Sequence, residues 1–385
     1  MTETRRGHVL VAGVTTRALA VSAARAGYKV TALDAFGDLD LRAAAEVIVP
    51  RPEPHTRFTP LEAARAADDV TAGFAVYTSN FENYPNAVAR LSQGRCLLGN
   101  PADVLLRVRD PIELMRVLRR QGFATPKTRA AAGAGAGRGS WLLKPRRSGG
   151  GHGITVWRGG CPAPRSRYIQ ERIDGTPGSI VFAADGRNAV ALGLTRQLVA
   201  DPNFGAQGFR YCGSLLGSPS SLFPNGDRLF DIAAALASTV TSEFGLVGLN
   251  GLDFMARDGV PYPIEVNPRF SASMELLERS HDLSMFELHA RACGRTLPAV
   301  APVSKGVEGK AIVFARRDVT LGDTHMWMGD RAFADVPHPG EHIQRGHPIC
   351  TVFARASDWQ SCHRLLIRRA ATVYRAAESA RRGAA

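Results

Sequence analysis

Hydrophobic and polar positions alternate in two different ways along the first hundred residues. Short apolar, β-prone runs occur at 8–12, 29–33, 73–77 and 96–98. Segments with helical spacing lie between them, at 18–26, 61–69 and 86–93. A strand–helix rhythm of this kind is typical of a parallel sheet covered by helices. We therefore predict an α/β domain with a parallel sheet over residues 1–100.

The pattern changes after residue 100. Two short helical segments lead into an Ala/Gly-rich stretch at 131–139, which we interpret as a surface loop. Short strands and glycine turns follow, and then an amphipathic helix at 227–244. Residues 306–356 are again strand-rich, and a final helix is expected after them. We divide this part of the chain into 101–215, with linker helices and a small lid, and 216–385, with a strand-rich tail.

The composition of the 385 residues is that of a globular protein, with 45% hydrophobic and 22% charged residues. No uninterrupted apolar run reaches 18 residues, so we expect no transmembrane helix. The polar segment 1–7 lacks the apolar core of a secretion signal. The six cysteines show no CxxC spacing, which favours reduced thiols. We therefore expect a cytoplasmic protein with no membrane partner.

A formal net charge of +13 raises the question of a nucleic-acid partner. Only five of the 48 basic residues are lysine, and the arginines are dispersed among alanines and glycines. This dispersion indicates a compositional bias, so we expect no nucleic-acid binding. The scarcity of lysine also means that a lysine inside an apolar strand is informative.

The most specific pattern lies in the segment 248–269. An Asp-Gly pair at 258–259 separates two apolar runs and predicts a hairpin turn. Such a hairpin would place Asp253 opposite Glu265, with Cβ atoms about 5 Å apart, and Asn267 on the same face. Facing carboxylates repel each other unless a cation lies between them. We therefore predict that these three residues bind Mg²⁺, or Mn²⁺, together with phosphate oxygens; a solvated hairpin face is the alternative.

A glycine-rich loop follows an apolar strand that ends in Lys144. Its residues Ser148, Gly149, Gly150 and Gly151 precede another strand-like run at 154–156. Glycines allow backbone N–H groups to approach phosphate oxygens closely. The loop is not a P-loop, because no Gly-Lys-Ser/Thr follows and the next element is a strand. We predict a hairpin lid over a triphosphate, with a flexible turn as the alternative.

A third segment, 168–175, is a strand that ends in acid and glycine. Its extended backbone can offer an N–H and a C=O to an adenine edge, and Glu171 could accept a hydrogen bond from a ribose hydroxyl or the amino group. Taken alone, this is a common way for a strand to end.

Together and in chain order, these motifs resemble the ATP-grasp superfamily over roughly residues 100–290. The segments that carry the resemblance are Leu142–Pro145, Gly149–Gly153, Gln170–Gly175, Asp253 and Glu265–Arg269. The resemblance implies a biotin-carboxylase-like layout, in which a parallel-sheet α/β domain precedes a two-lobed α+β ATP-grasp fold. It also implies the same magnesium ligands that the hairpin predicts.

The resemblance implies further residue roles. Lys144 and Arg269 would be the catalytic residues, Lys144 at the nucleotide phosphates and Arg269 at the transferred phosphoryl group or the acyl phosphate. Gln170, Glu171 and Ile173 would bind the nucleotide, Ile173 through its backbone.

One position departs from the family pattern. Many members carry a nucleotide-binding lysine before the helix expected at 111–121, and this chain has arginine there. We take Arg107 as the replacement, and Arg109 is equally near.

The chemistry implied by the resemblance is that of an ATP-dependent ligase. A carboxylate would attack the γ-phosphoryl group of ATP to give an acyl phosphate, and an amine or thiol would displace the phosphate. Glutamate and an amine such as tyramine are one substrate pair, because related ligases of furan-coenzyme assembly use such a pair. We expect ATP and Mg²⁺ as cofactors and a small carboxylate and an amine as substrates. A homodimer is one assembly that the chain could form.

Three other functions stay open. A carboxylating ATP-grasp enzyme would use bicarbonate. A NAD-dependent dehydrogenase is disfavoured because the first strand–helix loop, 13–18, lacks GxGxxG. A nucleic-acid binder is disfavoured by the dispersed charge.

The substrate sites are predicted less precisely, from loops that are rich in polar residues. Loops at the carboxyl ends of parallel strands are common ligand sites. The candidates are Thr15 and Thr16, Ser79 and Glu82, Ser271 and Ser273 after Arg269, and Arg196 and Arg210. For Thr15 and Thr16, helix capping is the alternative. Residues 335–353 are assigned a structural role in completing the last domain.

Overall fold

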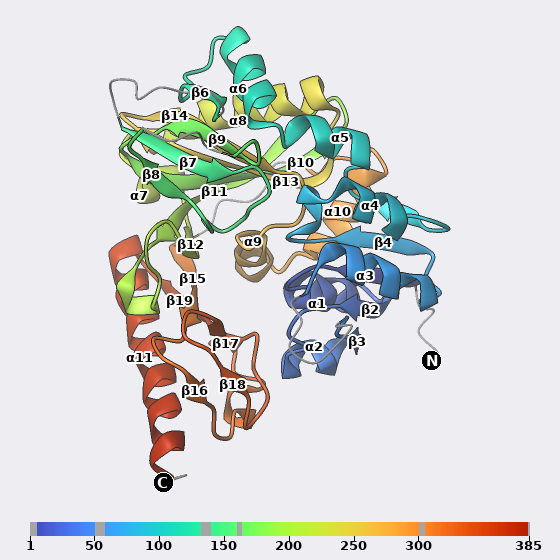
Figure 1. Ribbon diagram of the computed structural model, residues 1–385, viewed down its shortest axis with the longest axis vertical. Helices are drawn as coiled ribbons and strands as arrows, with labels where there is room; N and C mark the ends of the chain where they lie inside the picture. The colour runs from blue at the N-terminus through green and yellow to red at the C-terminus, as the bar shows by residue number, and fades with distance from the viewer. Residues whose placement is uncertain (1–5, 51–57, 132–139, 160–163, 300–304, 384–385) are drawn as a thin grey trace.

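A computed structural model describes residues 6–50, 58–131, 140–159, 164–299 and 305–383 (Figure 1). The Ala/Gly-rich segment predicted as a surface loop lies outside these ranges from residue 132 to 139. None of the helices in the described part of the chain is both long and apolar enough to span a membrane.

The N-terminal domain is a five-stranded parallel sheet in the order β3-β2-β1-β4-β5. Its strands are β1 (His8–Ala12), β2 (Lys29–Leu33), β3 (Glu46–Ile48), β4 (Phe74–Tyr77) and β5 (Cys96–Leu98). Its helices are α1 (Arg17–Arg25), α2 (Leu39–Ala44), α3 (Pro60–Ala66) and α4 (Pro85–Leu91). Along β1, Val9 and Val11 join one apolar cluster while Leu10 and Ala12 join another, because successive side chains face opposite sides of the sheet. The predicted parallel α/β domain is confirmed.

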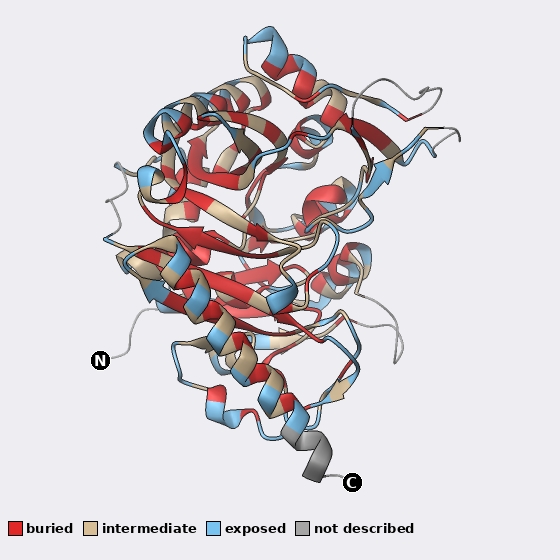
Figure 2. Cartoon of the chain, turned by 90° about the vertical axis from the view of Figure 1, so that its left-hand side faces the viewer, coloured by how far each residue is buried: buried red, intermediate tan, exposed pale blue. Residues whose placement is uncertain are grey.

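A large sheet forms the centre of the molecule, in the order β14-β13-β10-β11-β12-β15-β19-β17. Its strands are β10 (Thr176–Asp185), β11 (Ala189–Val199), β12 (Tyr211–Leu216), β13 (Val247–Arg257), β14 (Val260–Asn267), β15 (Val307–Phe314), β17 (Phe333–Ala334) and β19 (Pro348–Ala356). Helix α8 (Gly226–Phe244) packs on β10 and β11, and α11 (Trp359–Gly383) packs on β15 and β19. Figure 2 shows these strands as a buried layer beneath helices of mixed exposure. Strands β10 to β12 share this sheet with β13, so the sheet crosses the boundary that the sequence suggested at residue 215.

A small antiparallel sheet, β6-β9-β7-β8, lies beside the large one (Figure 1). Its strands are β6 (Thr128–Ala130), β7 (Trp141–Pro145), β8 (Thr155–Trp157) and β9 (Arg167–Glu171). The remaining elements are α5 (Ala102–Val108), α6 (Pro111–Arg120), α7 (Pro219–Leu222), α9 (Met274–His281), α10 (Met285–Cys293), and the paired strands β16 (Val319–Thr320) and β18 (His342–Ile343). A cavity opens between the small sheet, the large sheet and the N-terminal domain.

Candidate active site

One cavity of about 880 Å³ brings together residues from all three parts of the fold. The glycine-rich loop and β9 come from the small sheet, and β13 and β14 come from the large sheet. The loops that follow β1 and β4 come from the N-terminal domain. These loops lie at the carboxyl ends of parallel strands, where open α/β sheets usually bind ligands.

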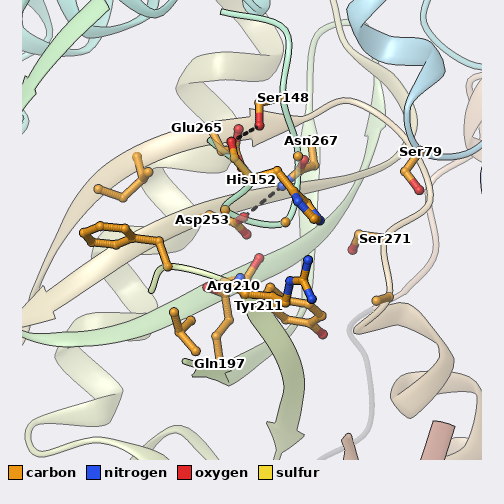
Figure 3. Close-up of a pocket in the computed structure, with 18 of the residues that line it drawn as sticks. Ser79, Ser148, His152, Gln197, Arg210, Tyr211, Asp253, Glu265, Asn267 and Ser271 are labelled. Carbon is orange, nitrogen blue, oxygen red and sulfur yellow. Dashed lines mark hydrogen bonds between the residues drawn. The ribbon is translucent and has the colours of Figure 1, made fainter. Parts of the chain in front are cut away.

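Strands β13 and β14 form the hairpin that the sequence predicted. Asp258 and Gly259 occupy its turn with φ of 55° and 73°, the left-handed values that a tight hairpin turn requires. The register pairs Asp253 with Glu265, and Asn267 follows on the same strand. Asn267 Nδ2 donates to Asp253 Oδ2 at 3.0 Å. A dashed line marks this hydrogen bond in Figure 3. All three side chains line the cavity.

The two facing carboxylates differ in their electrostatic surroundings. Burial raises the pKa of Asp253 to about 6, and the neighbouring charge of Glu265 adds to the effect. Burial also acts to raise the pKa of Glu265, but the guanidinium of Arg109 and then the ammonium of Lys144 hold it below its ordinary value. Asp253 is hydrogen-bonded to Ser179, Gln197 and Asn267 instead, which are neutral. Two carboxylates and an amide oxygen on adjacent strands are hard donors that suit Mg²⁺ or Mn²⁺.

Three basic side chains surround this hairpin. Lys144 is buried at the end of β7, where its Nζ lies 3.0 Å from Gln170 Oε1. Arg269 follows β14 and forms an ion pair of 2.9 Å with the buried carboxylate of Glu82. This pair joins a predicted catalytic residue to a predicted substrate residue of the N-terminal domain.

The third basic group is Arg109, and this corrects the first choice of Arg107. Arg109 Nη1 lies 3.0 Å from Glu265 Oε2, and its side chain is only 11% exposed. The Arg107 side chain is 52% exposed, donates to the Glu243 carbonyl, and lies over the ring of Phe244 outside the cavity. Two residues along a helix correspond to a rotation of about 200°, so neighbouring arginines face opposite ways.

The glycine-rich loop connects the antiparallel strands β7 and β8, so the predicted hairpin is present. Gly150 and Gly151 adopt left-handed φ values of 60° and 79°. The loop contacts the large sheet, where Tyr211 N donates to Gly150 O at 3.1 Å. A Cβ atom on Gly151 would lie 1.8 Å from the Phe209 carbonyl oxygen, so only glycine fits there.

The loop is also held from beneath. Ser148 Oγ donates to the His152 carbonyl at 2.6 Å, and Arg109 donates to the Ser148 carbonyl at 3.2 Å. Ser148, Gly149, Gly150 and Gly151 all line the cavity. The loop is therefore positioned to cover a ligand that lies over the β13–β14 hairpin.

The segment predicted at the adenosine comprises the end of β9 and the residues that connect it to β10. Gln170, Glu171 and Ile173 line the cavity, and Ile173 is buried. Glu171 Oε2 accepts from the backbone N–H of Lys127 at 3.0 Å.

Six of the eight predicted substrate residues line the cavity: Thr15, Ser79, Glu82, Arg210, Ser271 and Ser273. Ser271 and Ser273 lie with their hydroxyl oxygens 3.2 Å apart. Arg210 donates to the Gly346 carbonyl and lies over the Phe314 ring. Figure 3 shows Ser79, Ser271 and Tyr211 around the same opening as Asp253.

Thr16 and Arg196 do not line this cavity, so their assignment as substrate residues is corrected. The N–H and hydroxyl of Thr16 both donate to Asp34, at 2.6 and 2.8 Å. Arg196 packs over Trp359 in a separate hollow of about 300 Å³. Its neighbour Gln197 lines both this hollow and the main cavity, where its side chain is hydrogen-bonded to Asp253, because adjacent strand residues face opposite sides of a sheet.

The cavity also contains charged residues that sequence reasoning did not single out. Arg17, Lys310 and Asp335 line the end formed by the N-terminal domain and the tail. Lys310 is buried in the middle of the apolar strand β15, which matches the general signal that lysines are scarce and informative in this chain. Asp335 lies in the tail to which we assigned a structural role, so that segment also contributes to the cavity.

Part of the chain is similar to a family of known proteins. The family model for the ATP-grasp domain matches residues 108–273. An uncharacterized protein of Methanocaldococcus jannaschii is 30% identical over 119 residues, which are 30% of this chain. The matched region spans only 28% of the length of that relative.

Several solved structures share the fold over nearly the whole chain. The biotin carboxylase domain of Hydrogenobacter thermophilus 2-oxoglutarate carboxylase, in complex with MgADP, ADP and bicarbonate, has a TM-score of 0.72 and 16% identity, covering 92% of this chain and 87% of that one. Thermus thermophilus N5-carboxyaminoimidazole ribonucleotide synthetase has a TM-score of 0.68 and 19% identity, covering 94% and 97%. Bacillus licheniformis L-amino acid ligase has a TM-score of 0.68 and 15% identity, covering 96% and 98%. At these identities the likeness concerns the fold.

Proposed function

The chain carries an ATP-grasp domain within an ATP-grasp fold, and on this premise we propose that it is an ATP-dependent ligase. It activates the carboxylate of a small molecule as an acyl phosphate and couples it to an amine. The observation that carries the proposal is the convergence, in one cavity, of the Asp253–Glu265 pair, the basic side chains of Lys144, Arg109 and Arg269, and the glycine-rich hairpin.

The nucleotide would lie between the glycine-rich loop and the β13–β14 hairpin. Lys144 and Arg109 would contact its phosphates, and the loop amides would add further donors. The end of β9, with Glu171 and Ile173, would receive the adenosine. Asp253, Glu265 and Asn267 would hold magnesium, which when bound neutralises phosphate charge.

The reaction needs charge neutralisation and alignment more than a protein nucleophile. A carboxylate oxygen of the substrate forms a bond to the γ-phosphorus, and the bond to the β–γ bridging oxygen breaks to release ADP. The amine nitrogen then attacks the acyl carbon, phosphate leaves, and the amine loses a proton. Arg269 would stabilise the phosphoryl group in transfer, and Glu82 holds its guanidinium in place.

A screen for phosphate release tests this function. ATP and Mg²⁺ are incubated with the enzyme and paired amino acids and amines, glutamate with tyramine among them, and mass spectrometry identifies the condensed product. We expect at least one pair to stimulate ATP cleavage and to yield an amide and ADP. Stimulation by bicarbonate alone would instead indicate a carboxylating enzyme, and no stimulation by any pair would contradict the ligase proposal.

A further inference from the structure

Four charged side chains form a quartet at the end of the cavity remote from the β13–β14 hairpin. Arg17 begins α1, Glu275 lies in α9, Lys310 lies in β15, and Asp335 follows β17. The side chains of the first three are 7%, 8% and 5% exposed, and that of Asp335 is 23% exposed. Arg17, Lys310 and Asp335 line the cavity.

The contacts within the quartet alternate in sign. Arg17 is hydrogen-bonded to both oxygens of Glu275, and its Nε donates to Asp335 Oδ1 at 2.9 Å. Lys310 Nζ donates to Glu275 Oε2 at 2.6 Å. The four charges sum to zero, so the quartet offers a cationic and an anionic group within one small region.

Asp335 is fixed by its backbone as well as by Arg17. Its N–H and that of Val336 donate to the carboxylate of Asp40 at 2.9 and 3.0 Å. The Thr351 hydroxyl donates to the Asp335 side chain. The carboxylate is thus positioned by two other elements and still has the largest exposed fraction of the four.

Lys310 also has hydrogen-bonding capacity left for a ligand. An ammonium group has three N–H donors. Glu275 is the only hydrogen-bond acceptor for this ammonium that the structure shows among the residues it describes. Moving two charges out of water costs free energy that their mutual attraction often does not recover. The burial of these ion pairs is therefore not explained by a contribution to stability alone.

The quartet and the hairpin are built on different strands of the large sheet. The register pairs Asp253 on β13 with Ser179 on β10, and Ser214 on β12 with Lys310 on β15. Three strands, β10, β11 and β12, lie between β13 and β15 in the sheet. The quartet therefore forms a separate end of the same cavity.

We propose that Lys310 and Asp335 bind the α-carboxylate and the α-ammonium of an amino acid, whose side chain carries the reacting group toward Arg269. This rests on the proposed ligase function. With both α groups bound at the quartet, the amino acid reacts through its side chain. Ser271 and Ser273 lie in the segment between Arg269 and Glu275 and line the path between the two ends.

Calorimetric titration of the full-length protein tests the proposal without any variant. Each of the twenty standard L-amino acids is titrated in the presence of Mg²⁺ and ADP. Every amino acid that binds is then compared with its α-decarboxylated amine and its deaminated acid. We expect at least one amino acid to bind, and both of its analogues to bind at least tenfold more weakly. Binding by none of the twenty, or equal binding by either analogue, would overturn the proposal.

Variants locate the binding at the quartet. Lys310→Gln and Asp335→Asn should each weaken amino acid binding at least tenfold and leave the affinity for MgADP within twofold. Lys305→Gln, which removes a lysine charge from an exposed position just before β15, is the matched control and should bind like wild type. Amino acid binding that both quartet variants retain would overturn the proposal. If either variant fails to fold, the comparison of analogues on the wild-type protein still decides.

The same titrations separate this proposal from the proposed function. Failure of MgADP to bind the wild-type protein would contradict the nucleotide site and hence the ligase function. Binding of MgADP together with no amino acid binding would leave the nucleotide site in place and reject the role of the quartet alone.

Discussion

Replacing Arg109 with alanine removes the basic group that connects the glycine-rich loop to the β13–β14 hairpin. Its guanidinium donates to Glu265 at 3.0 Å, the Val266 carbonyl at 2.8 Å, Asn83 at 3.0 Å and the Ser148 carbonyl at 3.2 Å. If Arg109 contacts a nucleotide phosphate, the variant loses one charge-assisted hydrogen bond, worth about 1.5–3 kcal/mol. At 1.4 kcal/mol per factor of ten, the affinity for MgADP falls about 10- to 140-fold.

The same substitution should destabilise the protein. Removing one partner of a fully buried ion pair costs about 3–5 kcal/mol, a large part of a typical total of about 5–15 kcal/mol. The Arg109 and Glu265 side chains are 11% and 29% exposed, so we expect a loss below that range. Arg109→Lys keeps the charge without the forked geometry and should lie between wild type and Arg109→Ala. Urea unfolding reports stability, and calorimetric titration with MgADP reports binding.

Arg107→Ala is the matched control for this experiment. Arg107 lies two residues away and is exposed, and its ion pair with Glu113 spans 3.7 Å. Exposed ion pairs contribute about 0–1 kcal/mol, so we expect MgADP affinity within twofold of wild type. Loss of nucleotide affinity in Arg107→Ala, together with wild-type affinity in Arg109→Ala, would exclude Arg109 from the nucleotide site.

Further substitutions test other parts of the site. Asp253→Asn should abolish turnover yet stabilise the ligand-free protein near pH 7 by about 1–3 kcal/mol, because the raised pKa of about 6 marks an unfavourable buried charge. This gain, measured by urea unfolding, should shrink as pH falls from 7 toward 4, since Asp253 then protonates more readily folded than unfolded; a gain that grows instead would contradict the assignment. Gly151→Ala should lower ATP affinity far more than Gly150→Ala, since both have left-handed φ but an added Cβ collides with a carbonyl only at 151; equal losses would argue against docking of the loop. Glu82→Gln should lower kcat and leave the KM for ATP nearly unchanged, because it weakens the ion pair that positions Arg269 without contacting the nucleotide; an unchanged kcat would show that Glu82 does not position Arg269 for the reaction.

The features predictable from the sequence are those set by short-range geometry. The Asp-Gly turn fixes the register of its hairpin within a few residues, so the pairing of Asp253 with Glu265 follows from the sequence. The glycine-rich loop is likewise bounded by its own two strands.

Other features depend on facing and on distant contacts. The choice between Arg107 and Arg109 depends on which side of the end of α5 faces the β13–β14 hairpin. Arg196 lies outside the cavity because its side chain points to the opposite face of the strand from that of Gln197. The partners of Lys310 come from segments that the chain brings together only on folding, so no local pattern could reveal them. Asp335, more than three hundred residues from Arg17, illustrates the same limit.

The proposed chemistry depends most on a divalent cation that Asp253, Glu265 and Asn267 hold together with the nucleotide. Electron paramagnetic resonance of Mn²⁺ measures this directly, because the signal of the free ion falls when it binds. We predict that one Mn²⁺ per chain binds the wild-type protein in the presence of ADP, and that Glu265→Gln, which retains a hydrogen-bond acceptor for Arg109, lowers this affinity at least tenfold. Equal Mn²⁺ binding by the variant and the wild-type protein would contradict this cation site.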